Sequence, residues 1–323
     1  MQDNRSGENP LEKKAVSASS ATLLKNLYAR MLFSRIVDDC AWRLFEQGQI
    51  DFVASARGHE ATQVGSAVCI EVGLDFTLPY YRDLGVVLTI GMTPYEVFRT
   101  YLLAHSRHSA EGRPAGTSGE GRVERRWVHH WGYQKHNMIT STTPVATLIL
   151  HAAGVAFACK LRKVPAVTVA YCGDGATTEP DFLEGIKFAA QHALPAVFIC
   201  EQDCSDSTVS CKQELELPPG IEHRHVNGVD VVEVYDAMRN AMRHARSGLG
   251  PVLLEMHVVR SRPEQHEQMP SEQAPADPLL RCQQLMKEQG IWDEQWASEL
   301  YKRAFEEIGQ ALEDAMRDVV QMR

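Results

Sequence analysis

The sequence lacks any apolar run long enough to span a bilayer, and its polar start, MQDNRSGENP, is unlike a secretion signal. A basic excess is also missing: the formal net charge of −9 argues against general binding to nucleic acids or anionic membranes. We therefore expect a cytoplasmic protein that binds neither of them.

Cysteine pairs with the spacing of a metal site are absent too. The eight cysteines are scattered, and none of them forms a CxxC pair. Cys69, Cys159, Cys172 and Cys200 lie in apolar runs, which is typical of buried thiols. A structural zinc site built on these cysteines is therefore not expected.

The most informative stretch runs from Ala166 to Ser205. Its apolar start, 166–172, predicts a strand buried on both faces, and Gly173-Asp174-Gly175 predicts a sharp turn after it. Pro180 suits the first turn of a helix, and the apolar run 196–200 predicts a second strand. Strand, turn, helix and strand together predict a right-handed βαβ unit with parallel strands.

Two acidic residues follow these two strands. Asp174 and Asp203 come just after the predicted strand ends, and ligands of open α/β sheets bind beyond the carboxyl ends of the strands. Two carboxylates at one place repel each other unless a cation lies between them, and Mg²⁺ takes oxygen ligands together with substrate phosphates. N–H groups of Gly175 and of the following helix suit those phosphates. These residues predict a metal–diphosphate site.

Gly173-Asp174-Gly175 with Asp203 resembles the diphosphate–magnesium signature of thiamine-diphosphate enzymes. The surrounding GDGATTEPDFLEGIKFAAQHALPAVFIC is similar to the alpha subunit of 2-oxo acid dehydrogenases of the pyruvate, branched-chain and acetoin type. The resemblance covers about residues 21–316. It implies the cofactors thiamine diphosphate and Mg²⁺.

The resemblance also implies site residues. Asp174, Asp203 and the carbonyl group of Ser205 are expected to bind the metal, Tyr81 and Arg82 the diphosphate, and the backbone at Thr143 and Val145 the aminopyrimidine ring. Arg82 has an alternative interpretation as a surface arginine paired with Asp83. The complete set of expected cofactor-binding residues is Tyr81, Arg82, Thr143, Val145, Gly173, Asp174, Gly175, Ala176, Asp203 and Ser205.

Two histidines are candidates for the chemistry. His130 occupies the family's histidine position, counted back from Pro144, and is expected either near the substrate or in a structural role. His266 is a possible substitute for the histidine of the family's Gly-His-Ser loop, which this chain lacks; the alternative is an exposed histidine in a polar loop. The chain also lacks the family's Gly-Arg-Gln-Met-Pro run and has Asp203 where the family has asparagine.

The fold expected is α/β, a mostly parallel sheet flanked by helices. Residues 1–20 are predicted to form a flexible arm, and 21–323 a single thiamine-diphosphate-binding domain that ends in an amphipathic helical tail suited to packing on the sheet or on a partner. The Gly/Ser/Arg-rich segment 105–126 is predicted to be a loop.

The function implied by the resemblance is oxidative decarboxylation of a 2-oxo acid, with acyl transfer to lipoyl groups. The partners implied are a beta subunit, in a heterotetramer, and a lipoyl-bearing acyltransferase. Two alternatives stay open at this point. One is a divergent alpha-like subunit with a structural or regulatory role, and the other is an acetoin-cleaving or non-oxidative thiamine-diphosphate enzyme.

Overall fold

A five-stranded sheet forms the centre of the protein. The computed structural model describes residues 18–110, 130–205, 215–262 and 276–322. The strand order is β1-β2-β3-β5-β4, and each pair of neighbours is parallel. The strands are β1 (Phe76–Leu78), β2 (Thr168–Gly173), β3 (Ala196–Asp203), β4 (Glu222–Asn227) and β5 (Val252–Val258). The expected parallel α/β fold is confirmed.

The predicted βαβ unit is present. After β2 the chain forms a short 3₁₀ helix, η2 (Asp174–Thr178), then α6 (Pro180–Gln191), then β3, which pairs in parallel with β2. Pro180 is in the first turn of α6, as its missing N–H favours. Strand β3 is longer than predicted, because it continues through polar residues to Asp203.

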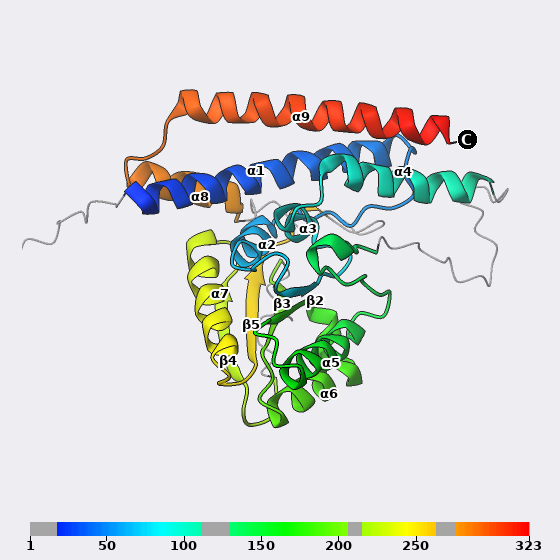
Figure 1. Ribbon diagram of the computed structural model, residues 1–323. Helices are drawn as coiled ribbons and strands as arrows, with labels where there is room; N and C mark the ends of the chain where they lie inside the picture. Colours follow the sequence, from blue (N-terminus) through cyan, green and yellow to red (C-terminus); the bar gives the residue numbers. More distant parts are fainter. Residues whose placement is uncertain (1–17, 111–129, 206–214, 263–275, 323) are drawn as a thin grey trace, which may run out of the picture.

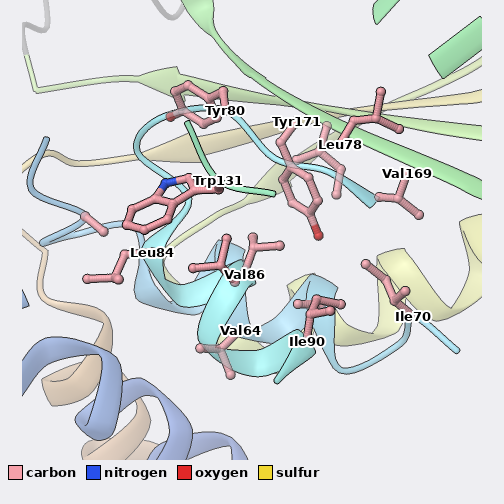
Figure 2. Close-up of a cluster of buried hydrophobic side chains, with 14 of the residues drawn as sticks. Val64, Ile70, Leu78, Tyr80, Leu84, Val86, Ile90, Trp131, Val169 and Tyr171 are labelled. Atoms are coloured by element: carbon pink, nitrogen blue, oxygen red, sulfur yellow. The ribbon is translucent and has the colours of Figure 1, made fainter. Parts of the chain in front are cut away.

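Helices cover both faces of this sheet. Figure 1 shows α7 (Val231–Arg246) on one side of the sheet, with α5 (Thr147–Leu161) and α6 on the other. On the side of α7 lie α2 (Glu60–Ala67), which contacts α7, and α3 (Leu84–Ile90), which contacts α2. Figure 2 shows Val86 and Ile90 on the side of β2 toward which Tyr171 projects, and Val64 and Val169 belong to the same core cluster. This apolar layer fixes the strands against the short helices.

Long helices form a second layer beyond the carboxyl ends of the strands. Figure 1 shows the arrow of β5 pointing toward this layer, which contains α1 (Ala18–Glu46), α4 (Pro94–Ala110), α8 (Pro278–Glu288) and α9 (Glu294–Gln321). The C-terminal helix α9 packs chiefly against α4 and α1. The prediction that α9 packs on the sheet is wrong, because α1 and α4 supply the apolar surface on which it packs.

Two further predictions concern segments that lie largely outside the described residues. Most of the arm 1–20 and most of the loop 105–126 lie outside the described residues, although α4 continues through residues 105–110, which were predicted to be loop. A short 3₁₀ helix, η1 (Gln134–His136), follows the second gap. Among the described helices, none has the length and apolarity needed to cross a membrane.

Candidate active site

The two predicted acidic residues lie at the carboxyl ends of neighbouring strands. Asp203 is the last residue of β3, and Asp174 opens η2 directly after β2. They are close enough to interact: burial raises the pKa of Asp174, the Gly175 N–H lowers it, and the negative charge of Asp203 raises it further. The carboxyl pair therefore favours a cation or a proton beside Asp174.

The Asp203 carboxylate already has donors. Its Oδ2 lies 3.1 Å from Nε of Arg260, and its Oδ1 accepts a hydrogen bond from the Ser205 N–H at 3.0 Å. The Ser205 hydroxyl also donates to Oδ1. Burial alone would raise the pKa of Asp203, but these hydrogen bonds and the charges of Arg260 and His59 outweigh burial and hold it below its usual value. Asp203 is thus the more acidic member of the pair.

The glycine turn leaves its backbone accessible. The Gly175 N–H donates to Oδ1 of Asp174 at 2.9 Å, and a Cβ atom placed on Gly175 would meet nothing within 4 Å. Ala176, by contrast, is buried. A Cβ on Gly173 would reach the ring of Tyr80 at 3.7 Å. The turn therefore presents open backbone at Gly175 while its flanks are packed.

Arg82 is a buried residue with a defined position. It is 6% exposed, its Nη1 donates to the carbonyl group of Ser55 at 2.8 Å, and its guanidinium lies 5.6 Å from the ring centroid of Tyr81. The Ser55 hydroxyl in turn donates to Asp38 of α1 at 2.7 Å. The alternative of a surface arginine is wrong, because the loop before α2 covers this side chain.

His130 and Thr143 lie together. Nε2 of His130 is 3.2 Å from the Thr143 hydroxyl, and both residues are exposed. Next to His130, the buried indole of Trp131 donates to the carbonyl group of Tyr81 at 3.0 Å. This hydrogen bond ties the segment that carries His130 and Thr143 to the segment that carries Tyr81 and Arg82. Segments that are about fifty residues apart in the sequence thus meet.

The remaining predicted residues are less constrained. Val145 is half-buried in the turn before α5. His266 lies outside the described residues, and its predicted role is therefore not tested. No described contact tests the assignment of these residues to a cofactor, and their roles stay predictions.

A buried polar cluster beside Asp203 was not predicted. Oε2 of Glu201, two residues earlier on β3, accepts hydrogen bonds from the Tyr80 hydroxyl at 2.6 Å and Gln63 Nε2 at 3.4 Å, and lies 2.7 Å from Nδ1 of His59. Glu201 Oε1 and His59 Nε2 are buried without a hydrogen-bond partner in the described part of the chain. Alternation along β3 puts Glu201 and Asp203 on one face, a signal that was available in the sequence.

Together these residues have the chemistry to hold an anionic ligand and a hard cation. Two carboxylates supply oxygen ligands, Gly175 supplies accessible backbone, and Arg260 supplies positive charge within reach of both aspartates. The unpartnered atoms of His59 and Glu201 provide further polar groups next to Asp203. Mg²⁺ with a phosphate group fits such a donor set.

A parallel sheet flanked by helices, with polar residues gathered at its carboxyl edge, is typical of α/β enzymes. The chain belongs to the dehydrogenase E1 component family, whose sequence profile matches residues 28–322. It is 32% identical over 307 residues to the 2-oxoisovalerate dehydrogenase subunit alpha of Bacillus subtilis (strain 168), an alignment that covers 90% of this chain and 89% of the relative.

Pyruvate dehydrogenase E1 alpha subunits are similar as well. The one from Staphylococcus aureus (strain Mu50) is 30% identical over 310 residues, which is 90% of this chain and 78% of the relative. The one from Bacillus subtilis (strain 168) is 29% identical over 313 residues, with 90% and 77% covered. The predicted resemblance to 2-oxo acid dehydrogenase alpha subunits is confirmed.

Proposed function

We propose that this chain is the alpha subunit of a 2-oxo acid dehydrogenase that uses thiamine diphosphate and Mg²⁺. Membership of the dehydrogenase E1 component family supports the reaction class. The single structural observation that carries the proposal is the pairing of Asp174 and Asp203 at the ends of β2 and β3. A cytoplasmic location remains a prediction.

The residues present fit the metal and the diphosphate. Asp174, Asp203 and the backbone carbonyl group of Ser205 form an all-oxygen donor set, which Mg²⁺ prefers. The raised pKa of Asp174, caused by burial and by Asp203, signals a demand for positive charge at this place. The open backbone at Gly175 and the cationic side chain of Arg82 suit phosphate oxygens.

Thiamine diphosphate, when bound, supplies the carbon nucleophile and the electron sink for decarboxylation of a 2-oxo acid. The chain itself has a different task. Asp174 and Asp203 hold the metal, while Tyr81 and Arg82 bind the diphosphate. The backbone at Thr143 and Val145 receives the aminopyrimidine.

The histidines have the remaining roles. His130 stands beside Thr143, where its imidazole meets the substrate or carries a proton. His266, which follows β5 in the sequence, is proposed to contact the reacting groups.

The proposal includes partners. A beta subunit is expected to complete the site from the other side in a heterotetramer, and a lipoyl-bearing acyltransferase is expected to take up the acyl group. The exposed positions of His130 and Thr143 support a site that is shared with a second chain.

The test measures binding and turnover of the chain co-expressed with the beta subunit. We expect thiamine diphosphate with Mg²⁺ to bind in calorimetric titration, and 2-oxoisovalerate or pyruvate to release CO₂ and acylate lipoyl groups. The alanine variants D174A and D203A should each weaken cofactor binding by about tenfold or more, because each removes a ligand oxygen. D203N should retain binding, since asparagine keeps that oxygen.

Asp236 offers the matched control. It is an exposed aspartate on α7 paired with Arg239, so D236A removes a carboxylate outside the site and should leave cofactor binding unchanged. Equal binding by the wild type, D174A and D203A would contradict the site. Absence of cofactor binding with and without the beta subunit would contradict the enzymatic function.

The Arg260–Asp203 ion pair favours a second candidate function. A guanidinium already neutralises Asp203, so the same fold is able to serve as a non-catalytic or regulatory alpha-like subunit. In that case the chain assembles with a beta subunit but binds no thiamine diphosphate. An acetoin-cleaving or non-oxidative enzyme is distinguished in the same assay by turnover of acetoin, or by CO₂ release without lipoyl acylation.

A further inference from the structure

A cluster of histidines and a carboxylate lies on the edge of the sheet, away from the site described above. His223 and His225 are on the edge strand β4, and Glu255 and His257 are on its neighbour β5. His225 pairs directly with Glu255 in the parallel register. Residues two apart on a strand share a face, so all four side chains project from one face of the sheet.

This face is opposite the one that carries Glu201 and Asp203. Glu255 pairs in register with Cys200 of β3, whereas Glu201 and the second residue after it, Asp203, alternate to the other side. The cluster shares no residue with the proposed cofactor site, although the charges of both Glu255 and Asp174 act on Cys200.

The ligand atoms of the cluster are within reach of one ion. One nitrogen of His223, one nitrogen of His225 and one oxygen of Glu255 all lie within 4.8 Å of one another. His223 Nε2 is 3.0 Å from Glu255 Oε1, and His225 Nδ1 is 3.1 Å from Glu255 Oε2. Ligand atoms around a tetrahedral Zn²⁺ ion are about 3.3 Å apart, given bonds of about 2.0–2.2 Å.

Two of these atoms lack hydrogen-bond partners. Nε2 of His223 and Oε1 of Glu255 are both buried, and neither has a partner with hydrogen-bond geometry among the described residues. The two atoms face each other at 3.0 Å in a contact that lacks hydrogen-bond geometry, although buried polar atoms normally have such bonds. A cation bound by both atoms would satisfy them.

We infer that His223, His225 and Glu255 bind one divalent transition-metal ion of the zinc class. Two imidazoles and one carboxylate suit Zn²⁺, Co²⁺ or Ni²⁺ and disfavour Mg²⁺, which prefers oxygen ligands. The side chain of Glu255 is 5% exposed and anchors the site, while that of His225 is 57% exposed and opens it to solvent. The His257 ring, 5.4 Å from that of His225, closes one side.

The ion has a structural consequence. β4 is an edge strand, held to the sheet on one side only by β5. Metal ligands from both strands fasten β4 to β5, and the binding free energy then contributes to the stability of the folded state. This site differs from the cysteine-based zinc that the sequence argues against, because its ligands are histidines and a glutamate.

The experiment uses the full chain, purified with any subunit that accompanies it and freed of affinity tags. The protein is dialysed against Zn²⁺ in the presence of excess Mg²⁺, which keeps oxygen-ligand sites filled, and retained zinc is measured by mass spectrometry. Wild-type protein should retain one Zn²⁺ per chain and gain thermal stability. Co²⁺ should give visible d–d absorption without the charge-transfer band of thiolate ligands.

Three variants make the result specific. H225Q removes an exposed ligand at little risk to folding, E255Q removes the central one, and each should weaken Zn²⁺ binding by about tenfold or more. H151Q changes an exposed histidine on α5 and should bind as the wild type does. Wild-type protein that retains no zinc, or folded H225Q that retains as much as the wild type, would overturn the inference.

Discussion

Arg260 forms an ion pair with Asp203 of the candidate site and acts electrostatically on Asp174 as well. Its Nε is 3.1 Å from Oδ2 of Asp203, and its positive charge also lowers the pKa of Asp174. Asp203 places a second negative charge near that of Asp174. The arginine offsets that charge, and the two residues are expected to act as a unit.

A double-mutant cycle tests this unit. R260Q leaves two carboxylates beside an anionic diphosphate and should weaken thiamine diphosphate binding by about tenfold, or ~1.4 kcal/mol. D203N alone should change affinity little, and R260Q combined with D203N should restore it, because the unbalanced charge is gone. Calorimetric titration in the presence of Mg²⁺ provides the measurement. Additive effects of the two substitutions on affinity would show that Arg260 does not compensate the charge of Asp203. R239Q on α7 controls for the loss of an exposed arginine.

The hydrogen bond from Trp131 to Tyr81 should position the segment proposed to bind the diphosphate. W131F removes the donor and leaves the Tyr81 carbonyl group without it, so we expect the free energy of unfolding to fall by about 1–2 kcal/mol. Affinity for thiamine diphosphate should fall with it. Urea unfolding and calorimetry measure the two effects.

Trp292 supplies the control for that substitution. Its indole N–H is buried without a hydrogen-bond partner among the described residues, so W292F loses ring area but no hydrogen bond. We expect W292F to leave cofactor affinity unchanged and to cost less stability than W131F. Equal losses in the two variants would assign the effect to packing alone.

Gly58 should tolerate no side chain. Its φ is +100°, and a Cβ atom would lie 2.0 Å from the carbonyl oxygen of Val259, at the end of β5. G58A should therefore lower the free energy of unfolding by about 2–4 kcal/mol. G48A is the matched control: Gly48 also has positive φ, but its Cβ would meet nothing within 4 Å, and we expect a cost of about 1 kcal/mol. Chemical denaturation of both variants checks the difference.

The Asp277–Arg35 ion pair should make stability depend on pH. Burial by itself would raise the pKa of Asp277, but hydrogen bonds and charge from Arg35, with Nη1 2.9 Å from Oδ2, hold the pKa below its usual value. A lowered folded-state pKa stabilises the protein above the unfolded-state pKa of about 4, and that contribution is lost as the pH falls through the folded-state value.

D277N isolates this effect, because asparagine still caps α8. At pH 7 the variant should be less stable than the wild type by about 1–2 kcal/mol, and the difference should shrink below about pH 4. Urea unfolding at both pH values measures it. Asp293 caps α9 in a similar way and has no arginine bridge in the described part of the chain, so D293N should show a smaller difference. A pH-independent difference for D277N would refute the ion-pair explanation.

The βαβ unit was predictable because its signals are local. Apolar runs indicated β2 and β3, glycines indicated the turn between them, and Pro180 indicated the start of α6. Each of these signals extends over only a few residues. The ends of the two predicted strands then indicated Asp174 and Asp203, which the structure brings into electrostatic contact. Their assignment to a metal remains a prediction.

The partners of these residues were not predictable from local patterns. Arg260 follows β5, and His59 precedes α2, yet both act on Asp203 at the end of β3. Glu201 gave a weak signal, since a carboxylate in an otherwise apolar strand needs partners, but the sequence does not say that Tyr80 and His59 supply them. Long-range contacts of this kind depend on how the strands and helices are ordered in space.

The sequence by itself determined the secondary structure around the glycine turn, the parallel α/β class and the family, because these follow from hydrophobic periodicity, turn chemistry and a local motif. Only the tertiary structure decided that Arg260 neutralises Asp203, that α9 lies on α1 and α4, and that His223 and His225 face Glu255. Strand order and register bring such residues together. Neither can be deduced from local sequence patterns.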